Sequence, residues 1–442
     1  MERLERASRE ELREVVVRQQ AEIAVLLARV DELEGEVRRL RRGGGSQGEL
    51  SIRPSRPPRE HKSRKHRGQA FVRRREVADE VRYHVAACCP DCGRRLEGGG
   101  EHRRRQTIEV VLQKRVVDHV LVARWCGVCQ KRVLPRLEAG ELGAQGKRRF
   151  GASVQGLVAA LNVGYRIPVR MIRRLLREMV GLQISEGEVV GLVDGVRQAG
   201  KQTLRELLEQ VRGSPAVCAD ETGWREDGKN GYLWGFFTPR VRWFEYRETR
   251  AGHVPTEVLG EEFGGVVSCD FYAGYNKLGV LQRCWVHLLR DAKELAQLNA
   301  DRPETGAWVE ALGALYREAK AFSHPKERVR WRARRRFERL AAQLARPYLS
   351  DADAPQRTLA QRIMKHRPEL FVFVSNPEVP GDNNLAERSL RPAVVARKIS
   401  GGTRSAKGSE TRMGLMSLFG TWQAQGKPLL ASCQRLLLPT TA

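Results

Sequence analysis

The 442-residue sequence predicts a multidomain α+β protein, and three observations indicate this fold class. A heptad repeat of apolar residues runs from Val16 to Leu40, within the first 42 residues. Two Cys-x-x-Cys pairs follow it. Short apolar strand patterns begin at Ala216 and give way to long helical patterns after Trp285. A chain of this length holds about two to four domains.

The charge of the chain predicts a polyanionic partner. There are 79 Lys and Arg residues against 53 Asp and Glu residues, which leaves a net charge of +26. Nucleic acids and anionic membranes both attract such a surface. No segment approaches the run of about 18 apolar residues that a membrane span needs, and the first residues lack the apolar core of a secretory signal. We therefore expect a soluble, cytosolic protein that binds nucleic acid and has no membrane partner.

Residues 1–42 predict a leucine-zipper-like coiled coil. β-Branched residues at a and leucines at d favour a parallel two-stranded coiled coil, so we expect a homo-oligomer that is at least a dimer. A single amphipathic helix packed on its own chain is the alternative. The a positions hold Val16, Ile23, Val30 and Val37, and the d positions hold Gln19, Leu26, Leu33 and Leu40.

Residues 43–80 predict a flexible basic arm, because prolines interrupt a dense run of Arg and Lys. Such an arm is either a solvated tail or a phosphate contact that becomes ordered on binding. The charge of the whole chain favours phosphate binding. The residues of the arm that we expect to contact DNA are Arg64, Lys65, Arg67, Arg73, Arg74 and Arg75.

Residues 81–140 predict a zinc ribbon. Each Cys-x-x-Cys pair places two thiolates on one tight turn, as tetrahedral zinc requires, and strands expected at 107–112 and 116–125 form a hairpin between the pairs. One structural zinc is expected. Four buried or redox cysteines are the alternative. The expected ligands are Cys89, Cys92, Cys126 and Cys129.

Residues 141–212 predict a helical region with helix-turn-helix character. An amphipathic helix over Val169–Val180 ends at Gly181, and Ser185 with Glu188 forms a capping box that opens the next helix. DNA reading by this helix pair and an ordinary αα-hairpin remain equally open.

Three carboxylates are the candidates for catalysis. Asp220 closes the first of four expected strands and Asp270 closes the fourth, so both should lie at one end of a sheet. Glu387 lies on a helix that Asp382 or Asn383 can cap. Two divalent ions about 3.5–4 Å apart need such oxygen ligands for phosphoryl transfer. The expected strands are Ala216–Ala219, Tyr232–Phe237, Arg242–Tyr246 and Val266–Cys269.

Each carboxylate also has a structural interpretation. Aspartates at strand ends are often turn formers, and Glu387 could pair with Arg391 one helical turn away. Glu221 follows Asp220 directly, and since successive strand residues point to opposite faces, only one of them can line a site. Asp382 remains an outside candidate for a ligand near Glu387.

Four segments resemble the transposases of the insertion sequence sixty-six family. They are Cys218–Arg225, Gly228–Trp234, Ser268–Tyr275 and Asp382–Arg388. The resemblance implies a ribonuclease-H-like catalytic domain in two parts, residues 213–287 and 371–442, separated by a helical insertion over residues 288–370. It also implies that Asp220, Asp270 and Glu387 form an Asp-Asp-Glu triad that binds two Mg²⁺ or Mn²⁺ ions.

The resemblance further implies a bacterial, cytoplasmic and nucleoid-associated DNA transposase. Its partners would be the double-stranded DNA of the element ends and target, together with any accessory proteins that the element encodes. The Cys284–His287 segment resembles a Cys-x-x-His motif of such transposases, which implies that His287 is a neighbour of the active site. A buried structural imidazole is the alternative. Rival functions are a zinc-containing DNA-binding regulator with an inert domain, or a ribonuclease-H-type nuclease. Further expected DNA contacts are Arg334, Arg335, Arg388 and Arg391.

Overall fold

The computed structural model describes residues 75–135 and 149–438. The chain divides into two compact units, Met1–Ile108 and Glu109–Ala442, and each is described by itself. The expected coiled coil of residues 1–42 lies outside the described residues, so the zipper and the dimer remain predictions. The same holds for the arm residues Arg64, Lys65, Arg67, Arg73 and Arg74.

In the first unit, the Cys89–Cys92 pair lies on one tight turn. The N–H of Gly93 donates to the carbonyl of Cys89 and the N–H of Cys89 donates to the carbonyl of Arg94, both at 2.9 Å. Gly93 has a φ of +71°, which a residue without Cβ adopts at no steric cost. The chain therefore reverses locally at the first cysteine pair.

In the second unit, a short hairpin surrounds the other cysteine pair. Strand β1 (Arg124–Cys126) pairs antiparallel with β2 (Lys131–Val133). The expected strands over residues 107–112 and 116–123 are not formed, and this part of the prediction was wrong. The side chains of Val110 and Val111 are exposed, so no described residue covers the apolar pattern there.

A helical region precedes the sheet. The capping box is confirmed: the N–H of Glu188 donates to Ser185 Oγ at 3.1 Å and the N–H of Ser185 donates to Glu188 Oε2 at 2.8 Å. Gly181 ends the preceding helix in the left-handed conformation, at a φ of +61°. The elements are α2 (Ala152–Ala159), the π-helical turn η2 (Ala160–Gly164), α3 (Val169–Val180), α4 (Glu186–Ala199) and α5 (Lys201–Arg212).

A mixed five-stranded sheet follows, in the order β5-β4-β3-β6-β7. Strands β3, β4 and β5 are antiparallel neighbours, whereas β6 and β7 run parallel to β3. Asp227 and Gly228 both have positive φ at the β3–β4 turn, as the tightest hairpins require. The strands are β3 (Ala216–Glu226), β4 (Lys229–Phe237), β5 (Arg242–Arg247), β6 (Val266–Cys269) and β7 (Val280–Arg283), with α6 (His253–Leu259) and the 3₁₀ turn η3 (Ala273–Tyr275) between them.

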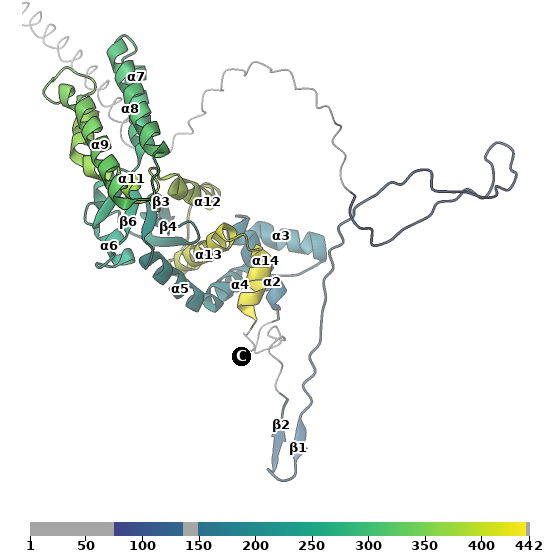
Figure 1. Cartoon of the computed structure of the whole chain (residues 1–442). Helices are drawn as coiled ribbons and strands as arrows, with labels where there is room; N and C mark the ends of the chain where they lie inside the picture. Colours follow the sequence, from purple (N-terminus) through teal and green to yellow (C-terminus); the bar gives the residue numbers. More distant parts are fainter. Residues whose placement is uncertain (1–74, 136–148, 439–442) are drawn as a thin grey trace, which may run out of the picture. The chain divides into compact units, whose positions relative to one another are not determined.

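A helical insertion with its own hydrophobic core continues from β7. Trp285, Leu312, Phe337 and Phe371 are among its buried residues. Figure 1 shows α7, α8 and α9 running side by side away from the sheet. The elements are α7 (Trp285–Leu298), α8 (Pro303–Ala321), α9 (Glu327–Ala345), η4 (Arg346–Tyr348), α10 (Arg357–His366), η5 (Arg367–Glu369) and α11 (Val372–Ser375).

Three more helices complete the second unit: α12 (Asn384–Ser400), α13 (Ala406–Ala424) and α14 (Leu429–Leu437). Helix α13 covers the edge strand β5. The N–H of Phe244 donates to Ser417 Oγ and the N–H of Arg242 donates to Thr421 Oγ1, both at 2.9 Å. These contacts satisfy donors that an open sheet edge would otherwise expose.

The sheet and its helices confirm the expected mixed α+β class. Among the described residues, no helix combines the length and the apolar character that crossing a membrane would take.

Candidate active site

Asp220 and Asp270 lie at the same level of two neighbouring parallel strands. The last parallel pair between β3 and β6 joins Cys218 to Ser268, and the same register two residues later sets Asp220 opposite Asp270. Asp270 directly follows β6, as expected. Asp220 does not end its strand, because β3 continues to Glu226 in its pairing with β4. Both aspartates nevertheless lie where the parallel pairing stops, the edge at which such sheets commonly bind ligands.

Helix α12 brings Glu387 to the same edge. Asn383, just before the helix, donates from Nδ2 to the carbonyl oxygen of Ala219 at 2.8 Å. Its backbone N–H lies 3.1 Å from Cys284 Sγ, next to the first residue of α7. The N–H of Trp285 donates to the carbonyl of Gly381 at 3.2 Å. The start of α12 is therefore fixed between β3 and α7, one turn before Glu387.

The pKa of Asp220 is raised, and three neighbouring carboxylates contribute to this shift. Burial, followed by the negative charges of Glu221, Asp270 and Glu387, raises this pKa from 3.8 to about 8. Like charges this close disfavour ionisation unless a cation offsets them. Within the described ranges, no group of three or more His, Cys, Asp or Glu side chains is arranged to hold a metal ion as it stands. The triad residues gather at one place without forming a ready-made coordination shell.

His287 lies beside Glu387. Its Nε2 is 3.6 Å from Glu387 Oε1, and Arg290 Nη2 is also 3.6 Å from that oxygen. Both His287 Nδ1 and Glu387 Oε1 are buried and have no hydrogen-bond partner among the described residues. Buried polar atoms are nearly always paired in folded proteins, so these two call for a further ligand or water.

Glu221 occupies a separate, satisfied position. Its side chain is only 2% exposed and accepts hydrogen bonds from Tyr275 Oη at 2.5 Å and from Arg250 Nε at 2.8 Å. Burial is the main cause that raises the pKa of Glu221. Arg250 also lies over the ring of Tyr272, 3.9 Å from its centroid. These partners hold Glu221 in place, whereas Asp220 has no cationic partner in the part of the chain that the structure describes.

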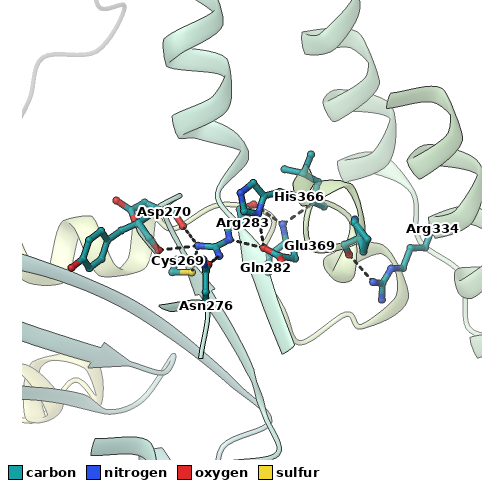
Figure 2. Close-up of polar contacts among 11 residues, drawn as sticks. Cys269, Asp270, Asn276, Gln282, Arg283, Arg334, His366 and Glu369 are labelled. Atoms are coloured by element: carbon teal, nitrogen blue, oxygen red, sulfur yellow. Dashed lines mark hydrogen bonds and ion pairs between the residues drawn. The ribbon is translucent and has the colours of Figure 1, made fainter. Parts of the chain in front are cut away.

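A fully buried arginine holds the backbone around Asp270, as Figure 2 shows. Arg283, at the end of β7, donates from Nη1 to the carbonyl oxygen of Asp270 at 2.8 Å and to that of Tyr272 at 3.3 Å. Its Nη2 donates to Asn276 Oδ1. The planar guanidinium fork thus fixes three points of the segment that follows β6.

The counter-charge of Arg283 comes from the insertion. Glu369 Oε2 lies 2.6 Å from Arg283 Nε, and Nδ1 of His366 lies 3.0 Å from the same oxygen (Figure 2). Burial is the main cause that lowers the pKa of His366. Gln282 donates from Nε2 to the carbonyl of Leu370 at 3.1 Å. The end of the insertion is therefore attached to β7, close to Asp270.

Sequence reasoning did not identify Arg283 or Glu369. Strand β7 was not expected, because Gln282 and Arg283 are polar residues that the apolar pattern of a buried strand does not include. The signal was present in the pair Val280 and Leu281, which begins a short strand just before Cys284.

The expected DNA contacts occupy different environments. Arg388 and Arg391 are exposed on α12, just after Glu387, and Arg335 is exposed on α9. Arg334 is mostly buried and donates to Glu338 Oε1 at 2.9 Å and to the carbonyl of Pro368 at 2.7 Å. Arg75 is exposed and donates to the carbonyl oxygen of Arg104 at 2.6 Å.

The four cysteines of the expected zinc site fall in both units, two in each. Backbone N–H groups of the turn are the main cause that lowers the pKa of the Cys89 thiol. The corresponding turn lowers the pKa of the Cys126 thiol, led by the backbone hydrogen bond from Cys129. Both turns favour the thiolate form that zinc binds. The four-cysteine site itself remains a prediction.

Among known proteins, the chain is similar to a curated protein of uncharacterised function. The chain is 31% identical over 166 residues to "Uncharacterized protein y4jO" of Sinorhizobium fredii. The matched region is 36% of this chain and 48% of that protein, so the chain spans about half the length of this curated relative.

A family model identifies the chain more directly. The model described as "Transposase IS66 family" matches residues 147–411, a range that contains Asp220, Asp270 and Glu387. Since the match covers more than half of the 442 residues, the chain belongs to the IS66 family of transposases.

Proposed function

We propose that this protein is the DNA transposase of an insertion sequence. It binds the terminal inverted repeats of the element, cleaves a DNA strand there in a metal-dependent reaction, and joins the freed 3′-hydroxyl to target DNA. The convergence of Asp220, Asp270 and Glu387 carries this proposal. The raised pKa of Asp220 supports it, because Asp270 and Glu387 are both among its causes.

The strand arrangement supports a ribonuclease-H-like catalytic domain. Three antiparallel strands are followed by two strands parallel to β3, and the two aspartates share the edge where β3 and β6 separate. The insertion lies between the second aspartate and the glutamate, which is the organisation that the resemblance implies.

The residues at this edge fit a divalent metal. Asp220 has no cationic partner among the described residues, and Glu387 Oε1 is buried without a hydrogen bond. Carboxylate oxygens are the ligands that Mg²⁺ and Mn²⁺ prefer. We propose that Asp220, Asp270 and Glu387 hold two such ions, which when bound would activate the attacking oxygen and stabilise the leaving oxygen.

The other residues of the site orient these ligands and the DNA. Arg283 holds the carbonyl of Asp270, and Asn383 holds α12 against β3. His287 and Arg290 border Glu387 Oε1, where they can hold a phosphate oxygen or a water near the glutamate. Arg388 and Arg391 are exposed beyond it and would contact the DNA backbone.

A cleavage assay tests this proposal. Purified full-length protein is incubated with duplexes carrying the element ends, in the presence of Mg²⁺ or Mn²⁺. We expect nicking at the ends, and we expect Asp270→Asn to abolish nicking while end binding persists. This substitution keeps the Oδ1 atom that accepts from the N–H of Tyr272 at 2.9 Å, so the loop should remain intact.

The same assay separates the rival functions. A protein that binds the ends but never nicks them with either metal is a DNA-binding regulator, and the enzyme proposal fails. Cleavage of RNA–DNA hybrids without any need for defined ends would instead indicate a ribonuclease-H-type nuclease.

We further propose one structural zinc bound by the four cysteines. Metal analysis of the purified chain should find about one zinc per protomer, as a single tetrahedral four-cysteine site predicts. The double variant Cys89→Ser with Cys126→Ser should lose it. An unchanged zinc content in that variant would refute the site.

A further inference from the structure

The insertion carries a groove lined almost entirely by arginine. Its volume is about 700 Å³, and it lies along α9, η4 and η5. The lining residues are Arg332, Arg335, Glu338, Arg339, Arg346 and Arg367. We call the five arginines of this set the groove arginines.

The groove arginines lack partners, unlike other arginines of the same helix. None of their guanidinium groups makes an ion pair or hydrogen bond with any residue that the structure describes. Arg334, by contrast, pairs with Glu338, and Arg336 pairs with Glu318 at 2.8 Å. Arg330 donates to the carbonyls of Ser375 and Pro325. On α9, Arg330, Arg334 and Arg336 therefore hold the fold, whereas Arg332, Arg335 and Arg339 line the groove without a partner among the described residues.

The one acidic residue of the lining does not neutralise the groove. Glu338 Oε1 accepts from Arg334 Nε at 2.9 Å, and the two side chains are only 19% and 13% exposed. The positive charge of the five guanidinium groups is left without a counter-charge from the described protein. Such an accumulation of like charge lowers the stability of the fold slightly and favours binding of a polyanion.

The spacing of the groove arginines suits a nucleic acid strand. Arg332, Arg335 and Arg339 share one face of α9 at intervals of three and four residues. They span about 10 Å along the helix axis at 1.5 Å per residue. This length corresponds to about three phosphates of one DNA strand, at 3.4 Å of axial rise each.

The lining argues against a small-molecule ligand. Binding sites for small molecules are mostly apolar, with a few polar groups that fix orientation, whereas this groove has no apolar or aromatic lining residue among those described. We propose that the groove arginines bind the sugar–phosphate backbone of DNA without reading its sequence. This inference rests on the proposed function, since it makes the insertion a second contact for the same DNA.

Binding measurements at several KCl concentrations test the inference. The full-length variant Arg335→Ala with Arg339→Ala is compared with wild type on two labelled duplexes, one with an element end and one unrelated. Each lost phosphate contact should reduce the slope of log K against log[KCl] by about 0.9, so the double variant should lose about 1.8. The affinity should fall by the same factor for both duplexes.

Two controls make the result specific to the groove. Arg302→Ala with Arg336→Ala removes the same charge from the insertion outside the groove, and it should leave the slope unchanged. Arg335→Lys with Arg339→Lys keeps the charge and should retain most of the slope. Circular dichroism confirms that each variant is folded.

Three results would overturn the inference. They are an unchanged slope in the alanine variant, an equal loss in the outside control, and a loss confined to one of the two duplexes. Binding is measured without divalent metal, so the outcome does not depend on cleavage. The inference about the groove can therefore be refuted although end-specific nicking is observed, or supported although nicking is not observed.

Discussion

Arg283, at the junction of the sheet and the insertion, differs from the groove arginines of the insertion in what its guanidinium contacts. Arg283 is fully buried, with Glu369 and several carbonyl oxygens around its guanidinium. The groove arginines have no partner among the described residues. Arginine therefore joins buried parts of the chain at the junction with the sheet, whereas in the groove its charge is unpaired among the described residues.

The difference shows that charge alone does not locate a DNA contact. The basic run on α9 looks uniform in sequence, yet Arg334 is committed to Glu338 and Pro368 while Arg335 faces the groove. On α9, the arginines that the fold leaves without a partner among the described residues are therefore the ones most available to phosphate. The following predictions test that distinction, from the largest expected effect to the smallest.

The largest effect is expected at Arg283. Arg283→Met removes a buried charge, takes away the arginine partner of Glu369 and leaves the carbonyl of Asp270 without this donor, which should cost about 3–5 kcal/mol in the free energy of unfolding. Urea unfolding of the purified variant measures it. A variant as stable as wild type would show that the network does not attach the insertion to β7. If the variant folds, binding of Mn²⁺ should also weaken, because Asp270 is no longer held.

The second effect concerns Asp220 and pH. Because its pKa is about 8 in the folded protein against 3.8 for the ordinary group, the folded state retains a proton that the unfolded chain has released. Stability of the metal-free protein should therefore fall as the pH rises from about 6 to 8, by at most about 1.4 kcal/mol per pH unit, and level off above pH 8. Asp220→Asn should remove this dependence.

Thermal unfolding of the wild type and the Asn variant on either side of pH 8 measures the difference. Equal pH dependence in the two proteins would contradict the raised pKa. Added Mg²⁺ should stabilise the wild type more than the variant, because a bound cation offsets the clustered carboxylates.

A smaller effect is expected at Arg334. Arg334→Ala removes the donors to Glu338, to Ser375 Oγ at 3.2 Å and to Pro368, and should cost about 1–3 kcal/mol. Urea unfolding checks this value. DNA affinity should change little, and a steeper loss of binding than of stability would place Arg334 among the DNA contacts after all.

The smallest effect is expected at Arg335, next in sequence. Its side chain is exposed and has no partner among the described residues, so Arg335→Ala should change stability by less than about 0.5 kcal/mol. The two single variants on the same helix should therefore show opposite results. Arg334→Ala should lose stability and keep DNA affinity, whereas Arg335→Ala should keep stability and lose DNA affinity. A large loss of stability would mean that the groove arginines support the fold.

The sequence was sufficient wherever the decisive interaction is local. The capping box of Ser185 and Glu188 spans three residues, and Gly181 ends its helix by its own backbone conformation. Four of the five strands of the sheet are recognisable from their apolar and aromatic residues, which form buried runs in β3, β4 and β6. The positions of Asp220 and Asp270 follow from those strands.

The remaining features depend on distant partners. Arg283 and Glu369 are 86 residues apart, and no local pattern joins them. Strand β7 contains Gln282 and Arg283, which are buried only because the insertion supplies Glu369 and Leu370 as partners. The expected strands around Val110 were not formed for the opposite reason, since their apolar side chains are exposed and no residue in the described part of the chain packs against them.

The hydrogen bond from Asn383 to Ala219 joins residues 164 positions apart. It has a consequence for the order of synthesis. A nascent chain exposes β3, β6 and the whole insertion before the ribosome has added Glu387. During that interval the protein can fold its sheet and present its arginines, yet the third carboxylate is missing. The cleavage activity that we propose therefore cannot arise before Glu387 has been added.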